Sequence, residues 1–165
     1  MKRYLLLSIA LLLVFKGISQ NKSLNDYSYV VIPEHFDFLK TNDQYQINSM
    51  TQFYLEKNGF NAYMANEAPN AKPCDGLYAD VEELRTLIGT RIQLVLKDCN
   101  KVEVYRSEIG RSKYKEYDKA YQDALRNAFR ELEGLRIKQK KVVLLDQNNE
   151  SQEVNSKDNG NLKKS

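Results

Sequence analysis

The sequence predicts an α+β fold, an α/β two-layer domain in which two main helices pack on one face of a mixed sheet of about four strands. Three patterns predict it: a strand–helix–strand unit within residues 27–64, a hairpin within residues 90–109, and an amphipathic helix after Gly110. The expected order of elements is β-α-β-(short α)-β-β-α.

The strand–helix–strand unit begins at residues 27–33, whose β-branched and aromatic side chains form a nearly continuous apolar run. Such a run predicts a strand inside a sheet. A T-x-x-Q capping box at Thr41 and Gln44 predicts a helix to about Asn58, with Gly59 as its stop. A short strand over residues 60–64 completes the unit, and such crossovers join parallel strands.

Residues 66–76 are rich in proline and asparagine and predict an irregular loop, after which a short helix is expected around residues 79–87. In the hairpin, Ile92, Leu94 and Leu96 alternate with polar residues on the way to a turn at residues 98–100. This alternation predicts antiparallel strands with one buried face.

Ser112 is the candidate N-cap of the last helix, which is expected to exceed 20 residues. The apolar residues that recur at helical spacing are Tyr117, Tyr121, Ala124, Leu125, Ala128, Leu132 and Leu135. Such a stripe needs an apolar surface to cover, and the buried face of the hairpin supplies it. Residues 142–145 are expected to add a weak strand.

The two ends of the chain differ from this domain. Residues 1–19 read as a signal peptide, because Lys2 and Arg3 precede an apolar run that Lys16 closes at about half the length of a membrane span. An uncleaved anchor is the alternative. We expect a polar leader at 20–26, a single domain at 27–145 and a disordered polar tail at 146–165. The expected location is periplasmic or secreted, with no transmembrane anchor after cleavage.

Charge and cysteine content narrow the function. The chain has 25 basic and 22 acidic residues, and the signal peptide carries three of the bases and no acid, so the mature chain is formally neutral. Nucleic-acid binding, which needs clustered positive charge, is therefore not expected. Cys74 and Cys99 are a disulfide candidate in an oxidising compartment, and two unpaired thiols are the alternative.

Chemical motifs are sparse, so the sequence predicts no catalytic residue, no cofactor and no metal site. The one histidine, His35, has no nucleophile motif beside it. Four acids, Asp75, Asp80, Glu82 and Glu83, fall close together in the sequence. They suit the first turn of a helix, and the alternative is that they act with His35 in a small envelope hydrolase.

Two surface features follow from the last helix. Tyr114, Tyr117 and Tyr121 share one side of it and either cover the sheet or form a binding face for a sugar or a protein. The cations at 136–141 either complement the negative end of the helix or contact anionic lipid or peptidoglycan.

Three segments carry a family resemblance: VVIP at residues 30–33, LVLKDCNKVEVYRSEIG at 94–110, and YKEYDKAYQDALRNAFREL at 114–132. They resemble the small α/β modules of bacterial envelope proteins, particularly the N-terminal domain of TolB and related lipoprotein domains. They are also similar to a group of exported bacterial proteins with the same DCN turn. The resemblance implies a binding or assembly domain without an active site.

The expected function is that of an exported, non-enzymatic domain that binds an envelope protein or a cell-wall component. The hydrolase is one alternative, and a structural subunit of an outer-membrane assembly is the other.

Overall fold

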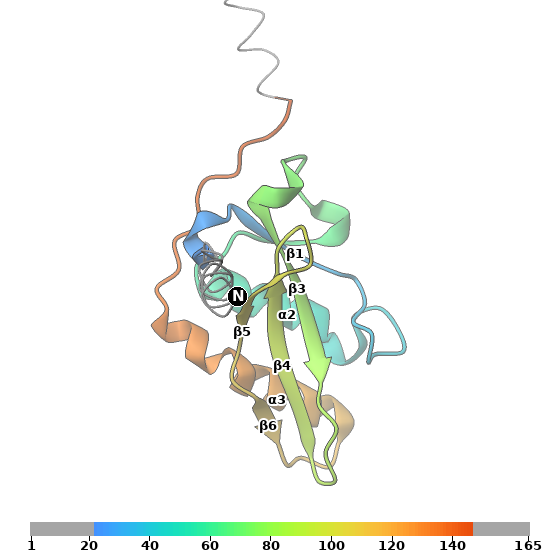
Figure 1. Ribbon diagram of the computed structural model, residues 1–165. Helices are drawn as coiled ribbons and strands as arrows, with labels where there is room; N and C mark the ends of the chain where they lie inside the picture. The colour runs from blue at the N-terminus through green and yellow to red at the C-terminus, as the bar shows by residue number, and fades with distance from the viewer. Residues whose placement is uncertain (1–21, 147–165) are drawn as a thin grey trace, which may run out of the picture.

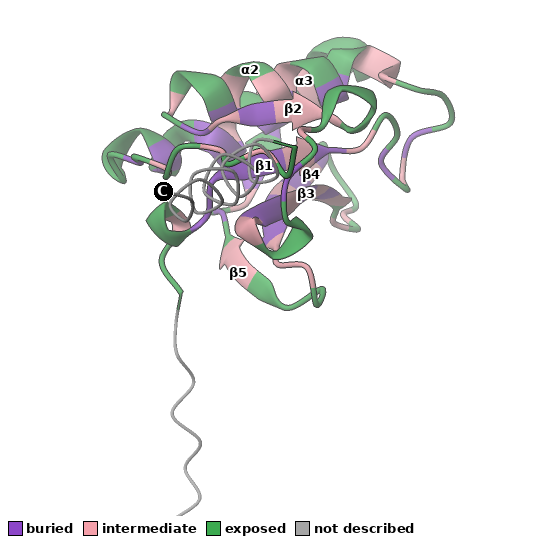
Figure 2. Ribbon diagram, turned by 90° about the horizontal axis from the view of Figure 1, so that it is seen from above, coloured by how far each residue is buried: buried purple, intermediate pink, exposed green. Residues whose placement is uncertain are grey.

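The computed structural model describes residues 22–146. Its strands are β1 (Tyr29–Ile32), β2 (Ala62–Met64), β3 (Gly76–Glu83), β4 (Thr90–Lys97), β5 (Glu103–Arg106) and β6 (Gly110–Ser112). They form one six-stranded sheet in the order β2-β1-β3-β4-β5, with β6 also paired to β4. Two main helices, α2 (Ile47–Lys57) and α3 (Tyr117–Phe129), lie on one face of it (Figure 1 and Figure 2). The predicted fold class is confirmed, with six strands where about four were expected.

The predicted strand–helix–strand unit is present as β1, α2 and β2. Val30 of β1 pairs with Ala62 of β2 in a parallel register, and β1 also pairs in parallel with β3. Gly59 ends α2 as expected: its φ is +90°, and its N–H donates to the carbonyl of Glu56. A residue with a Cβ atom is disfavoured in this left-handed conformation, so glycine suits the position.

The start of α2 differs from the predicted capping box at Thr41 and Gln44. The helix begins at Ile47, and a carboxylate oxygen of Asp43 accepts a hydrogen bond of 2.9 Å from the backbone N–H of Ser49 in its first turn. The backbone before the helix is left-handed at several positions, Asp43 among them, with a φ of +46°. This turns Asp43, rather than Thr41, toward the unpaired N–H groups of the helix.

The prediction of a short helix around residues 79–87 was wrong, because these residues include most of β3. Ala and Glu favour helices when neighbours are ignored. Leu77, Ala79 and Val81, however, alternate onto the buried face, and β3 is hydrogen-bonded to β1 on one side and to β4 on the other. Pairing on both edges outweighs the local helix preference.

The predicted hairpin is confirmed as β4 and β5, with Leu96 opposite Tyr105. The chain that pairs with β4 leaves the sheet after Arg106, the end of β5, and pairs with β4 again as β6. At the interruption, the hydroxyl of Ser107 accepts a hydrogen bond of 3.0 Å from the N–H of Leu94, and the N–H of Ser107 donates to the carbonyl of Leu94. Ser107 therefore keeps β4 bonded between the two short strands.

The last helix is shorter than predicted. Ser112 is the final residue of β6 rather than an N-cap, and α3 has 13 residues followed by a 3-10 helix, Arg130–Gly134. Tyr117 is exposed and lies outside the stripe. The residues that form it are Ala120, Ala124, Leu125, Ala128, Phe129 and Leu132. Pairing with β4 takes residues 110–112 out of the helix.

The core lies between the sheet and the two helices. Its largest fully buried side chains are Tyr27, Ile32, Phe36, Ile47, Leu55, Leu77, Ile92, Leu94, Leu96, Leu125, Phe129 and Leu132. Gly110 lets α3 approach the sheet closely, because a Cβ atom there would lie 1.9 Å from the carbonyl oxygen of Ala124.

After α3 the chain runs along the surface. The N–H of Lys140 donates to the carbonyl of Tyr27, and the N–H of Leu145 donates to that of Asn70. The weak strand expected at residues 142–145 is reduced to one isolated bridge between Leu144 and Ala71. The predicted signal peptide and nearly all of the predicted tail lie outside the described residues.

Candidate functional site

Within residues 22–146, no second layer of helices or strands covers the face of the sheet opposite α2 and α3, and we call this face the open face (Figure 2). Tyr78, Asp80 and Glu82 of β3 lie on it, because they alternate with the buried Leu77, Ala79 and Val81. Lys97 of β4 is opposite Tyr78 in the register and shares that face. Charged side chains therefore line the centre of the sheet on this side.

The predicted disulfide between Cys74 and Cys99 is confirmed, with a Cα–Cα distance of 5.0 Å. It joins the 3-10 turn before β3 (Pro73–Asp75) to the turn between β4 and β5. Both turns lie at the same end of the open face. The bond therefore fixes the position of the β4–β5 turn beside β3.

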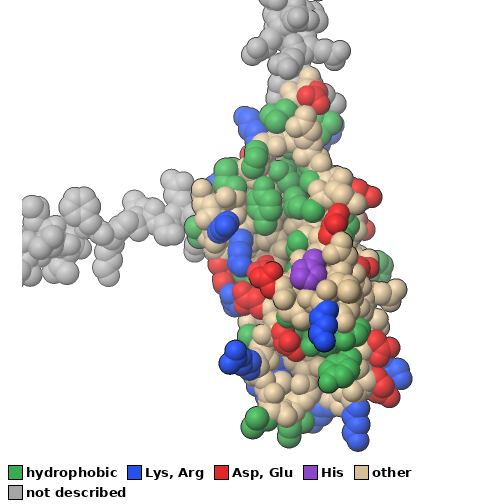
Figure 3. Space-filling view, turned by 90° about the vertical axis from the view of Figure 1, so that its right-hand side faces the viewer, with side chains coloured by type: hydrophobic (Ala, Val, Ile, Leu, Met, Phe, Trp, Pro, Cys, Tyr) green, Lys and Arg blue, Asp and Glu red, His purple; other side chains and the backbone are tan. Residues whose placement is uncertain are grey.

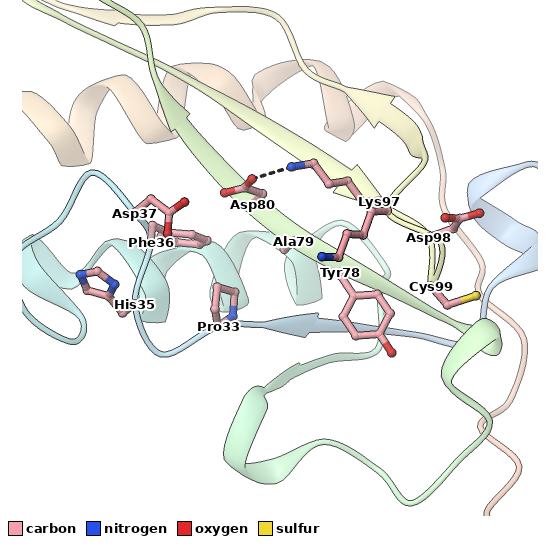
Figure 4. A pocket seen from close by; sticks show the side chains of 11 residues that line it. Pro33, His35, Phe36, Asp37, Tyr78, Ala79, Asp80, Lys97, Asp98 and Cys99 are labelled. Carbon is pink, nitrogen blue, oxygen red and sulfur yellow. Dashed lines mark hydrogen bonds and ion pairs between the residues drawn. The ribbon is translucent and has the colours of Figure 1, made fainter.

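A cavity of about 420 Å³ opens on this face, and Figure 4 shows it from close by. Its lining comes from the loop after β1, from β3 and β4, and from the β4–β5 turn. The lining residues are Pro33, His35, Phe36, Asp37, Tyr78, Ala79, Asp80, Lys97, Asp98, Cys99 and Lys101. Loops after the carboxyl end of a parallel strand commonly form binding sites, and the loop after β1 is one of them.

Asp80 and Lys97 form an ion pair in the middle of the cavity, with 2.7 Å between Oδ2 and Nζ (Figure 4). The hydrogen bond to Asp80 raises the pKa of Lys97, and partial burial opposes this effect. Lys97 therefore remains protonated at neutral pH and cannot act as a general base or an amine nucleophile.

The pair continues into a network along the open face. Arg106 binds Glu82 at 2.7 Å and Glu103 at 2.7 Å, and Glu82 also lies 4.0 Å from Lys97. The hydrogen bonds to Glu103 and Glu82 raise the pKa of Arg106, and Arg106 lowers the pKa of Glu103. The network fixes the charges of the open face between β3, β4 and β5.

His35 lines the cavity, but its side chain is engaged by its own loop. Its Nε2 lies 2.6 Å from the carbonyl oxygen of Leu39, so this nitrogen carries the proton in the neutral ring. In the view of Figure 4, Asp37 and Phe36 lie between His35 and the Asp80–Lys97 pair. The histidine therefore has no hydrogen bond to a carboxylate or hydroxyl among residues 22–146.

The four acids singled out in the sequence are separated by the strand. Asp80 and Glu82 face the open side, Asp75 lies in the 3-10 turn before β3, and Glu83 accepts a hydrogen bond of 2.6 Å from the Tyr121 hydroxyl. Of the four, Asp80 lines the cavity with His35. The helical first turn that was expected to group them is absent.

Two charged side chains of the cavity have no partner. Within the described part of the chain, the carboxylate of Asp37 and the ammonium group of Lys101 make no hydrogen bond or ion pair. Asp98, in contrast, accepts hydrogen bonds from the backbone N–H groups of Asn100 and Val102 within its turn. Among the described residues, Asp37 and Lys101 are thus the charged side chains of the cavity that make neither a hydrogen bond nor an ion pair.

The three tyrosines of the predicted binding face are in different environments. Tyr114 precedes α3 and is exposed, as is Tyr117. Tyr121 is partly buried, with its ring stacked on Tyr45 (5.1 Å between centroids) and on Phe38 (5.6 Å). Burial and the Glu83 carboxylate raise the pKa of Tyr121.

Sequence analysis did not single out the residues that complete the cavity, namely Asp37, Tyr78, Lys97, Asp98 and Lys101. A usable signal was present for two of them. Asp37 follows the carboxyl end of a predicted buried strand, and Asp98 begins the predicted hairpin turn. Tyr78 and Lys97 came together only because β3 is a strand that pairs with β4.

Comparison with known proteins gives few matches. No model of a known protein family matches the chain, and no curated protein matches it. Among solved structures, it is similar to a dodecamer of a PelC point variant from Paraburkholderia phytofirmans, with a TM-score of 0.45 and 17% identity. The match covers 72% of this chain and 93% of that chain.

Two searches of residues 22–146 bear on membranes and metals. None of the helices there is both long and apolar enough to span a bilayer. In the same residues, no three side chains of the His, Cys, Asp and Glu types are grouped so that they could hold a metal ion.

Proposed function

We propose that this chain is an exported, non-enzymatic binding domain, and that its cavity on the open face receives a peptide segment carrying both charges, from an envelope protein or a cell-wall component. The observation that carries the proposal is the unpaired Asp37 carboxylate and Lys101 ammonium group on the wall of one cavity. A ligand with one cationic and one anionic group pairs with both.

The lining of the cavity supports a peptide ligand of this kind. Its apolar lining, from Pro33, Tyr78 and Ala79, gives a surface for aliphatic or aromatic groups between the charges. Binding sites combine such apolar contacts with a few fixed polar groups, and the Asp80–Lys97 pair is one fixed element here.

The contacts made by Asp80 and His35, the two cavity residues named in the hydrolase alternative, favour binding over catalysis. Asp80 is neutralised by Lys97, and His35 is hydrogen-bonded to its own loop. A hydrolase needs a base that can reach a nucleophile or a water in the site. The export signal predicted from the sequence places the proposed ligand in the envelope.

Site-directed photo-crosslinking in cells tests this function. A photoreactive residue at Tyr78, which lines the cavity and leaves both unpaired charges in place, should form an adduct with a protein or with peptidoglycan, and one at Lys119 on the exposed side of α3 should not. Equal adducts at both positions, or none at Tyr78, would refute the proposal. The type of adduct distinguishes a protein partner from the cell wall.

A second measurement separates binding from hydrolysis. Purified protein is incubated with soluble peptidoglycan fragments and followed by nuclear magnetic resonance and mass spectrometry. We expect shifted amide signals around Lys97 and Lys101 with intact fragments. Cleaved fragments that disappear with His35→Ala would favour the hydrolase instead.

A further inference from the structure

The hairpin of β3 and β4 projects past the rest of the sheet at one end of the molecule (Figure 1). Its tip carries two adjacent aliphatic residues, Leu87 and Ile88, which are 103% and 83% exposed. Two hydrogen bonds within the hairpin stabilise the tip. The N–H of Leu84 donates to the carbonyl of Arg91, and the hydroxyl of Thr86 donates to the carbonyl of Ile88. The folded chain thus exposes two large apolar side chains on a hydrogen-bonded turn.

Basic residues lie close to this tip along the chain or in the neighbouring β6 segment, and the register of β4 and β6 brings two of them together. They come from the hairpin itself and from the segment of β6 and the β6–α3 connection: Arg85, Arg91, Arg111, Lys113 and Lys115. None of the five takes part in an ion pair within the described residues. The mature chain is formally neutral, so this positive end is a local concentration of charge.

Two of these cations face each other directly. Arg91 of β4 is opposite Arg111 of β6 in the antiparallel register. Like charges at opposed positions destabilise a sheet. The unfavourable pair is relieved when both guanidinium groups meet an external anion.

The acids at this end do not neutralise it. Glu116 pairs with Lys119 at 3.8 Å, and Glu83 is held by the Tyr121 hydroxyl. Asp118 and Asp123 lie in α3; Asp123 lines a surface hollow with Arg111 and Lys113 and forms an ion pair with Arg126 at 3.7 Å. Figure 3 shows hydrophobic side chains at the lower extremity of the molecule with Lys and Arg side chains beside them.

We propose that this end of the protein docks on an anionic lipid bilayer, with Leu87 and Ile88 inserted among the acyl chains and the nearby cations on the headgroups. The combination of aliphatic residues and nearby cations matches the two attractions of such a surface. The exposed Tyr114, between β6 and α3, and Tyr117, the first residue of α3, add aromatic rings with polar tips, which favour the interfacial region.

The geometry favours a lipid surface over a protein. The aliphatic pair sits on a convex tip, which a fluid surface accepts without a matching pocket. Phosphate oxygens are abundant on an anionic bilayer and can engage Arg91 and Arg111 together. The contact is peripheral, and it lies at a different place from the cavity on the open face.

Vesicle binding tests the proposal with the mature chain. Vesicles of phosphatidylethanolamine with one third phosphatidylglycerol should bind the protein, and phosphatidylcholine vesicles should bind it at least about tenfold more weakly. Binding should weaken in high salt, which screens the cationic contribution. Equal binding to both vesicle types, or to neither, would overturn the proposal.

Variants locate the contact. Leu87→Ser with Ile88→Ser, and separately Arg91→Gln with Arg111→Gln, should each weaken binding about tenfold or more. The matched control, Lys138→Gln with Lys141→Gln, removes the same charge from the segment after α3 and should leave binding unchanged. Loss of binding in the control alone would place the contact elsewhere. Thermal unfolding of each variant establishes that it is folded.

A spectroscopic variant measures insertion directly. The chain has no tryptophan, so Ile88→Trp introduces a single tryptophan at the tip, whose emission can be excited apart from that of the tyrosines. We expect a blue shift with anionic vesicles and quenching by lipids brominated on their acyl chains. A photoreactive residue at position 88 provides the alternative outcome. If it forms adducts with a protein while the chain does not bind vesicles, the tip binds a protein partner instead.

Discussion

Removing the disulfide should destabilise the domain by about 3.5 kcal/mol. The change is Cys74→Ser with Cys99→Ser, which opens a loop between residues 25 positions apart. This loop contains β3 and β4, the two central strands of the open face. Breaking the bond therefore frees the segment that forms most of the cavity.

The magnitude follows from the length of the closed loop. In the chain-entropy description, a cross-link over about 26 residues lowers the entropy of the unfolded chain by an amount equivalent to about 3.5 kcal/mol at 25 °C. Packing should contribute little, because Cys74 is exposed and Cys99 is partly exposed. For a domain of this size, the loss corresponds to a fall in Tm of roughly 14 °C.

Urea unfolding of the mature protein, with and without reductant, measures the effect. The oxidised protein should have the higher unfolding free energy, and reductant should bring it to the value of the double serine variant. That variant should not respond to reductant. A difference below about 1 kcal/mol would refute the loop-entropy reasoning. A double variant that still responds to reductant would show that another effect is being measured.

Three further predictions concern packing and ionisation. Gly110→Ala should cost roughly 2–4 kcal/mol in urea unfolding, because the new methyl group meets the Ala124 carbonyl, and Gly134→Ala, with no atom within 4 Å of the new methyl group, should cost almost nothing. Equal losses would contradict the close approach of α3. Burial, with Glu131 nearby, raises the pKa of Tyr105 to about 12 from 10.0, so the folded state keeps a proton that the unfolded state releases. The stability from this group should be complete below pH 10 and be lost as the pH rises through 12, and Tyr105→Phe should flatten the fall in alkaline unfolding curves. Asp80→Asn should lower the pKa of Lys97, followed by nuclear magnetic resonance of its side chain, and should cost less than about 1 kcal/mol because the pair is partly exposed. An unchanged Lys97 titration would show that Asp80 does not control it.

Periodicity predicted the elements in which local and tertiary preferences agree. Strand β1, the β4–β5 hairpin and the end of α2 at Gly59 belong to this group. Strand β3 was predicted as a helix because its Ala and Glu residues favour one in isolation, although Leu77, Ala79 and Val81 already alternate. Its true state depends on β1 and β4, which a local pattern does not contain.

The candidate site was less predictable than the fold. The cysteine pair was predicted from composition and from the predicted export signal, since two cysteines in an oxidising compartment favour one bond. The cavity brings together residues from the loop after β1, from β3 and from the β4–β5 turn, and the two furthest apart in the sequence, Pro33 and Lys101, are separated by 68 positions. Their meeting requires the pairing of β3 with both neighbours, so the error at β3 also concealed the site.

The strand position next to β4 is shared by two short strands, β5 and β6, and this affects the tendency of the protein to aggregate at high concentration. A long, uninterrupted border of free N–H and C=O groups invites another copy to add a strand. Here β5 and β6 have four and three residues, and the chain leaves the ladder between them at Ser107. This side of the sheet therefore offers no long edge strand to which a strand of a second molecule could bond, and we expect the protein to resist edge-to-edge polymerisation there.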